Sequence, residues 1–149
     1  MVELGGEIRL AGLNPKNKNW IVGIDKPGEN SMERELKATI SLTGKSLATS
    51  GNYRKFYVKD GIKYSHTIDP TTGYPVKHKL LSVTVIADDC ISADAYATAF
   101  LVMGTKRSKE FLINNSGLNL DVFLIYSGED GKRMTFATDG IKSVLTEKN

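Results

Sequence analysis

The sequence predicts an α+β fold, a single domain built on an antiparallel β-sheet with a few packed helices. Its 149 residues suffice for one hydrophobic core, and 40% hydrophobic with 25% charged residues is typical of a globular protein. Most apolar segments are short and bounded by turn residues, which indicates strands. The hydrophobic period lengthens to that of a helix only after residue 91.

The first strands are predicted from short apolar segments. Glu7–Ala11 and Trp20–Ile24 have strand character and are joined by a loop rich in Asn, Lys and Pro. Leu36–Leu42 alternates apolar and polar residues, the period-two pattern of a half-buried strand. Leu47–Thr49 is short and apolar, and ends at a Ser-Gly-Asn turn.

The middle of the chain predicts a hairpin followed by a buried strand. Tyr53–Lys59 and Ile62–Thr67 flank Asp60-Gly61, a dipeptide typical of two-residue hairpin turns. Leu81–Ala87 is apolar almost throughout, as expected for a strand covered on both faces.

Helices are predicted next. Ser92–Met103 contains four alanines and neither Gly nor Pro, and Gly104 is a natural residue to end it. A second, shorter helix is predicted over Lys106–Asn114.

The carboxy-terminal part predicts a hairpin and a last helix. Val122–Tyr126 and Arg133–Ala137 bracket a Gly-Glu-Asp-Gly turn. Thr138 or Asp139 could cap a final helix over Ile141–Leu145.

Composition argues against several classes of protein. Lys and Arg are scattered among acids at a formal charge of +3, so no nucleic-acid partner is expected. Cys90 is the only cysteine, which excludes an intrachain disulfide, and we expect it to be a small buried hydrophobe. The nearly apolar stretch Ala95–Met103 is far shorter than the ~20 residues that span a bilayer.

The first candidate site lies around His66 and Asp69, where a strand runs into a turn. An imidazole beside a carboxylate is a plausible general base, because its pKa lies near neutrality. The alternative is that His66 only hydrogen-bonds the turn and Asp69 bonds its own backbone. His78, flanked by two lysines, is expected at the surface.

The second candidate site is the pair Asp94 and Thr98, spaced i and i+4 on one face of the predicted helix. The helix is apolar nearly all round, so the carboxylate is expected to be buried and to need a cation or donors. Two hard oxygen ligands with open positions suit Mg²⁺. Alternatively, Asp94 favours the positive end of the helix dipole, and Thr98 bonds back to a carbonyl.

Two glycine-containing segments form a third, weaker candidate. Gly5-Gly6 precedes a strand, and Ser50 and Tyr53 lie in the segment Thr49–Arg54. Either segment could let backbone approach a phosphate or a ring, and a turn explains either as well.

In order, these pieces resemble the FAD:protein FMN transferase (ApbE) family over nearly the whole chain. No single motif is specific, but their joint order and spacing are. The matching stretches are Gly5–Ile8, Trp20–Ile24, Ala48–Arg54, Ser65–Pro70, Gly73–Pro75, Ser82–Ala87, Ala93–Ala95 and Ala97–Ala99 with Gly104.

The resemblance implies an antiparallel α+β fold related to the T-fold. It also implies an enzyme that binds FAD with Mg²⁺, splits the pyrophosphate and transfers FMN to a Ser or Thr hydroxyl, releasing AMP. The implied partners are acceptor flavoprotein subunits of respiratory complexes. The other hypothesis is a flavin-binding or FAD-scavenging module without transferase activity.

Carried over by position, the resemblance assigns Asp94 and Thr98 as Mg²⁺ ligands. It assigns His66 as the base for the acceptor hydroxyl, with Asp69 beside it. Ile68 is the implied backbone contact to FAD, and Ser50 and Tyr53 are the further predicted cofactor contacts.

The chain departs from the family in two places. Thr71 stands where the family often has Arg or Lys. The family's amino-terminal half, with a Lys-Gly motif and groups that hold the flavin, should precede Gly5. We therefore expect residues 1–149 to be the carboxy-terminal part of a flavin transferase. A lipid anchor in that half would place the protein at the periplasmic face of the cytoplasmic membrane.

Overall fold

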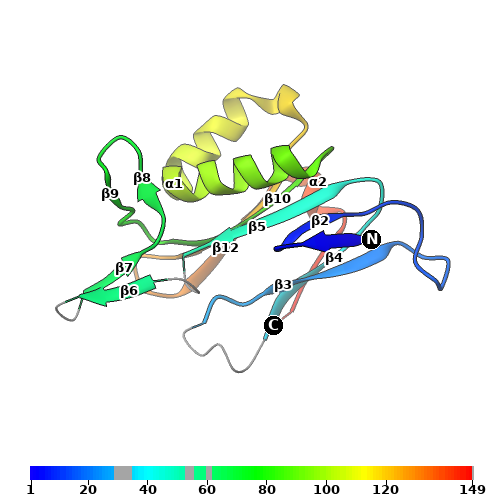
Figure 1. Ribbon diagram of the computed structural model, residues 1–149, viewed down its shortest axis with the longest axis horizontal. Helices are drawn as coiled ribbons and strands as arrows, with labels where there is room; N and C mark the ends of the chain where they lie inside the picture. The colour runs from blue at the N-terminus through cyan, green and yellow to red at the C-terminus, as the bar shows by residue number, and fades with distance from the viewer. Residues whose placement is uncertain (29–34, 53–55, 60–61, 149) are drawn as a thin grey trace.

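A computed structural model describes residues 1–28, 35–52, 56–59 and 62–148. A six-stranded sheet forms the middle of the molecule, with helix α1 on one face and a three-stranded sheet on the other (Figure 1). Every strand pair is antiparallel. The α+β fold expected from the sequence is therefore confirmed.

The strands fall into four sheets among the described residues. The large sheet has the order β1 (Val2–Leu4), β2 (Glu7–Arg9), β5 (Ser46–Gly51), β10 (Leu80–Ala87), β11 (Asp121–Ser127), β12 (Arg133–Ala137). The second sheet has the order β13 (Leu145–Glu147), β4 (Leu36–Leu42), β3 (Trp20–Asp25). Two hairpins are separate: β6 (Phe56–Lys59) with β7 (Ile62–Ser65), and β8 (Ile68–Asp69) with β9 (Tyr74–Pro75).

The large sheet has a hydrophobic core on each face. Strand β10 is buried almost throughout, as its apolar sequence predicts. Its Val83 and Val85 pack beneath α1 (Cys90–Asn114), whereas Ile86 points to the three-stranded sheet. Phe100 of α1 and Phe123 of β11 are fully buried on opposite faces. Burial on both faces fixes the register of β10 and the position of α1.

Helix α1 consists of two segments that fold back on each other at Gly104, whose φ of 77° and ψ of 173° are not helical. The ring of Phe111 consequently lies 6.1 Å from that of Tyr96 and 5.6 Å from that of Phe100. Ser108 is buried and donates a 2.7 Å hydrogen bond to the Gly104 carbonyl. The two helices predicted on either side of Gly104 are confirmed, and Figure 1 shows the fold-back.

Gly104→Ala is expected to destabilise the fold by roughly 2–4 kcal/mol. The residue has a left-handed φ, and a Cβ there would lie only 2.9 Å from Cδ2 of His78. Thermal unfolding should show a fall in Tm of several degrees. Gly117→Ala is the matched control, since a Cβ there meets nothing within 4 Å. Equal Tm values for the two variants would contradict this account of the break.

Several sequence predictions were wrong in detail. The predicted helix over Ile141–Leu145 is instead α2 (Asp139–Lys142), followed by β13, because Leu145 pairs with Ile40 of β4. Thr138 occupies the N-cap but makes no capping bond. Its hydroxyl donates to Asp121 and accepts from the backbone of residue 122.

Two further differences concern exposure. Cys90 is only half-buried, because it is the first residue of α1 and stands at the edge of the core. His78 is half-buried and not on the surface, since its ring packs against Gly104.

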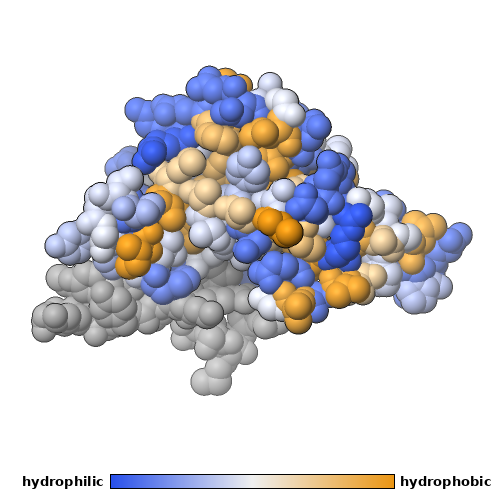
Figure 2. Space-filling model, turned by 45° about the horizontal axis from the view of Figure 1, so that its top comes forward, coloured by the Kyte–Doolittle hydropathy of each residue, from blue (hydrophilic) through white to orange (hydrophobic). Residues whose placement is uncertain are grey.

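The surface over α1 is mixed in character. Apolar side chains appear there in separate patches between hydrophilic ones (Figure 2). Ile91 and Ile113, near the two ends of α1, are among the exposed apolar residues. No helix in the described part of the chain is long and apolar enough to cross a membrane.

Candidate functional site

A cleft of about 900 Å³ opens between the β1–β2 hairpin, β3, the end of β5 and the first half of α1. It gathers residues that are far apart in the sequence. Four predicted site residues line it: Ser50, His66, Asp94 and Thr98.

The strand pairing explains why the cleft lies there. Strand β2 pairs with β5 only at Ile8–Leu47 and Arg9–Ser46. Beyond Leu47, the edge of β5 toward Ser50 is therefore not covered by β2. The β1–β2 hairpin turns away through Gly5 and Gly6, which have φ of 70° and 114°. Both glycines line the cleft, so backbone forms part of its wall.

Ser50 and Thr98 meet across the cleft. The hydroxyl oxygens of the β5 serine and the α1 threonine lie 3.1 Å apart, in hydrogen-bonding distance. Thr98 thus does not depend on a carbonyl of its own helix, the alternative role considered from the sequence. The structure brings a predicted cofactor contact and a predicted metal ligand into direct contact.

Asp94 lies one turn before Thr98 on the same helix and also lines the cleft. Both side chains are exposed, so the expectation of a buried carboxylate was wrong. The apolar face of α1 points to the sheet through Ala93, Ala97 and Leu101, which leaves Asp94 and Thr98 on the side toward the cleft. An exposed carboxylate next to hydroxyls is accessible to a ligand.

Within the described residues, no group of three or more His, Cys, Asp or Glu side chains could hold a metal ion. The donor set of Asp94 and Thr98 nevertheless has the chemistry that Mg²⁺ uses. Mg²⁺ prefers hard oxygen ligands, takes few of them from protein, and fills its other positions with water or phosphate oxygens. The two residues fit such an ion, although they do not by themselves complete a site.

His66 lies between β7 and β8, and it is exposed at the edge of the cleft together with Thr67. The adjacent turn is held by backbone bonds, among them the one from the Val76 N–H to the Thr67 carbonyl at 3.0 Å. This location satisfies the requirement that a general base be reachable by its substrate.

Asp69 and Ile68 do not line the cleft. The Asp69 carboxylate accepts hydrogen bonds from the hydroxyl and the backbone N–H of Thr71, at 2.7 and 2.9 Å. These bonds lower the pKa of Asp69, the hydroxyl bond having the larger effect. This is the local turn considered as an alternative from the sequence. Ile68 is 47% exposed on β8, and Tyr53 lies outside the described residues.

Sequence reasoning missed three carboxylates of the cleft. Glu3 and Glu7 come from the β1–β2 hairpin, and Asp25 from the end of β3. The hairpin was readable from the glycines between Leu4 and Glu7, but its approach to α1 depends on pairing between distant strands. Together with Asp94, these groups make the cleft acidic.

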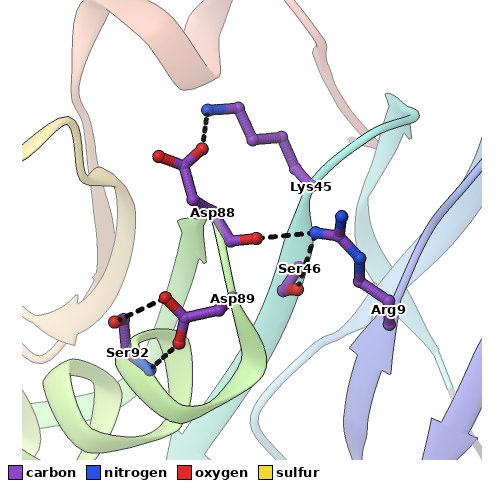
Figure 3. A network of polar contacts seen from close by, with 6 residues as sticks. All are labelled: Arg9, Lys45, Ser46, Asp88, Asp89 and Ser92. Carbon is purple, nitrogen blue, oxygen red and sulfur yellow. Dashed lines mark hydrogen bonds and ion pairs between the residues drawn. The ribbon is translucent and has the colours of Figure 1, made fainter.

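A polar network holds the start of α1 against the sheet (Figure 3). Arg9 of β2 donates to the Asp88 carbonyl at 2.6 Å and to the buried Ser46 hydroxyl at 3.3 Å. Lys45 forms an ion pair with the Asp88 carboxylate. These contacts fix the β10–α1 junction, one turn before Asp94, and so help to set the width of the cleft.

Asp89 is the N-cap of α1. Its carboxylate accepts from the backbone N–H of Ser92 at 2.8 Å and from the Ser92 hydroxyl at 3.0 Å. The backbone bond is the main cause that lowers the pKa of Asp89, with the hydroxyl second. A lowered pKa means that the ionised carboxylate stabilises the folded state.

Asp89→Ala is therefore expected to lower Tm at neutral pH, because the cap of α1 is lost. The cap's contribution is present above the ordinary carboxyl pKa of 3.8 and is lost as the pH falls through the lower folded value. The Tm difference from the unaltered chain should thus narrow below pH 3.8. Glu110→Ala, at an exposed carboxylate of the same helix, should show no such change. A pH-independent difference for Asp89→Ala would contradict this role.

Comparison with known proteins supports the resemblance. The ApbE family model matches residues 1–123. Over 147 residues the chain is 39% identical to the FAD:protein FMN transferase of Vibrio cholerae, covering 99% of this chain and 42% of that protein. It is 38% identical to that of Escherichia coli over 150 residues, covering 100% of this chain and 41% of that protein.

Solved structures agree with the sequence matches. The flavin transferase ApbE from Vibrio cholerae superimposes with a TM-score of 0.78 at 37% identity, covering 95% of this chain and 43% of that one. The ApbE protein from Thermotoga maritima gives a TM-score of 0.79 at 30% identity, covering 99% of this chain and 44% of that one. The chain spans about two fifths of the length of these relatives, and with its matching motifs, fold and cleft it belongs to the ApbE family.

Proposed function

We propose that this chain forms part of a magnesium-dependent FAD:protein FMN transferase. The observation that supports this most is the cleft, in which Ser50, His66, Asp94 and Thr98 converge from three separate segments. Its relatives in Vibrio cholerae and Escherichia coli carry the name FAD:protein FMN transferase. The reaction moves FMN from FAD to a Ser or Thr hydroxyl of a partner protein and releases AMP.

In this proposal, Asp94 and Thr98 hold Mg²⁺ through a carboxylate and a hydroxyl oxygen. When bound, the ion neutralises charge on the diphosphate of FAD. The hydroxyl of Ser50, 3.1 Å from that of Thr98, orients the threonine oxygen. Gly5 and Gly6 lack side chains where the cleft wall is backbone, which lets a diphosphate approach closely.

His66 accepts the proton of the acceptor hydroxyl, because its imidazole is neutral and exposed at the cleft edge. The hydroxyl oxygen then bonds to the phosphorus of the FMN half of FAD. The bond from that phosphorus to the oxygen of AMP breaks, and AMP leaves with the electron pair. Such a displacement depends on positioning more than on covalent chemistry by the protein.

The test is an assay by mass spectrometry on the full-length protein that the family resemblance predicts. The protein, FAD, Mg²⁺ and an acceptor protein are mixed, and the acceptor is examined for an added FMN mass. The proposal predicts labelling on a Ser or Thr that EDTA abolishes. FAD binding without labelling of any acceptor would instead support the alternative, a flavin-binding or FAD-scavenging module.

The partner and the location are further parts of the proposal. We infer from the family resemblance that the acceptors are flavoprotein subunits of respiratory complexes. The same resemblance suggests that the protein works at the periplasmic face of the cytoplasmic membrane, anchored by lipid through an amino-terminal segment. Cell fractionation followed by detection of the protein in the membrane pellet tests this location.

Residues 1–149 alone are expected to fold but not to transfer FMN. The two cores can support a cooperative transition, whereas the cleft offers only Asp94 and Thr98 to the metal and few groups to grip an isoalloxazine ring. In-line displacement needs its groups held to within roughly half an ångström. Thermal scans should show one transition with little shift on adding FAD and Mg²⁺, and no acceptor labelling. Robust labelling would show that this chain carries the whole site.

A further inference from the structure

A second cavity lies apart from the cleft and has no place in the proposed reaction. Its volume is about 890 Å³, and it shares no lining residue with the cleft. It lies between the second half of α1 and the end of the β11–β12 hairpin, next to the start of β10. We refer to it as the hairpin groove. Its lining combines Tyr126 and Met134 with lysines from α1.

The lysines give the hairpin groove positive charge that no carboxylate compensates. Lys79 is paired with Glu129 at 3.0 Å, and Asp130 is paired with Lys132 at 3.2 Å outside the groove lining. Within the described part of the chain, Lys106 and Lys109 have no carboxylate at ion-pair distance. Two ammonium groups therefore remain available to an anion.

Lys109 is held in position before any ligand arrives. Its Nζ lies 4.9 Å from the ring centre of Tyr126 and 4.7 Å from that of Phe136. It also lies 3.4 Å from the Tyr126 hydroxyl. Two aromatic rings and a hydroxyl fix the direction of a half-buried side chain, so little entropy is lost when it binds a ligand.

His78 adds a polar group that lacks a partner. Its Nδ1 accepts the Leu80 backbone N–H at 3.3 Å, which makes Nε2 the protonated nitrogen of the neutral ring. Nε2 is shielded from solvent, and no atom of the described residues accepts from it. Buried donors are normally satisfied. A residue of the groove lining therefore has an unused donor.

We propose that the hairpin groove binds a small amphipathic carboxylate, that is, a single negative charge carried on a flat apolar body. The charge would lie against Lys109 and the Tyr126 hydroxyl, and the apolar body against Met134 and the lysine stems. Glu129 and Asp130 at the groove disfavour a phosphate dianion, whose second charge they would repel. This inference does not depend on the flavin transfer proposed for the cleft.

The test uses naphthalene-2-carboxylate as the probe, with neutral naphthalene-2-methanol and inorganic phosphate as comparisons. Binding to the 149-residue chain is followed by ¹H–¹⁵N correlation spectra. We expect saturable shifts for residues of the groove, such as Thr105 and Gly128, with the carboxylate, and much weaker ones with the alcohol or phosphate. Absence of saturable shifts, or equal affinity for the alcohol or for phosphate, would overturn the proposal.

Variants assign the site to Lys109. Lys109→Met should weaken binding of the probe by about tenfold or more, the scale of a lost charge-assisted hydrogen bond. Lys109→Arg keeps the charge and should bind within a fewfold of the unaltered chain. Lys16→Met, in an exposed loop, is the matched control and should leave the affinity unchanged. If Lys109→Met, with its Tm retained, binds as tightly as Lys16→Met, the assignment is wrong.

Discussion

His66→Ala is expected to slow FMN transfer by roughly 10²-fold or more while FAD remains bound, which is the scale of losing a general base. The imidazole stands exposed at the edge of the cleft, where an acceptor hydroxyl can reach it, and takes that hydroxyl's proton. The measurement is the rate of acceptor labelling by the full-length protein, at saturating FAD and Mg²⁺, from pH 6 to 8.

The other histidine of the chain provides the control. His78 belongs to the hairpin groove and packs against Gly104, away from the cleft. His78→Gln should therefore lower stability and leave the labelling rate per folded molecule unchanged. A His66→Ala rate equal to that of the unaltered protein across the same pH range would remove His66 from the reaction and point to Asp69.

Asp94→Ala is expected to weaken FAD binding about tenfold or more when Mg²⁺ is present, and to have little effect when EDTA is added. The carboxylate lies in the cleft one turn from Thr98, and in our proposal it supplies the only charged ligand of this chain to the ion. Titration calorimetry with FAD, with and without Mg²⁺, measures the two affinities.

Two aspartates test whether the effect is specific. Asp139→Ala removes an exposed carboxylate that is paired with Lys142 at 2.7 Å, and FAD binding should not change. Asp89→Ala should affect stability through the helix cap, and the dependence on Mg²⁺ much less. If Asp94→Ala and Asp139→Ala bind FAD equally, Asp94 is not a metal ligand.

The sequence predicted local structure well wherever the pattern had a local cause. Alternation placed β4 at Leu36–Leu42 and β12 at Arg133–Ala137 with the observed bounds. Gly104 marked the break in α1, because only a residue tolerant of φ near 77° ends a helix in that way. Strand β13 was missed, since Leu145 becomes part of a strand only by pairing with the distant β4.

The site was predicted in composition but not in assembly. The i, i+4 spacing put Asp94 and Thr98 on one helix face, and the structure leaves that face open to the cleft. The contact of Thr98 with Ser50 depends on how α1 packs across β5, which no local pattern determines. The acidic groups Glu3 and Asp25 reach the cleft through strand pairing alone. The sequence therefore indicated the chemistry, and the topology determined its place.

A crystal structure of the full-length protein with FAD and Mg²⁺ would test most directly whether this cleft is a flavin-transfer site. We expect the ion at about 2.0–2.1 Å from an oxygen of Asp94 and from the hydroxyl of Thr98, with the diphosphate beside it. His66 should face the phosphorus of the FMN half from the side opposite AMP. A flavin bound elsewhere, or an ion that contacts neither Asp94 nor Thr98, would contradict the account.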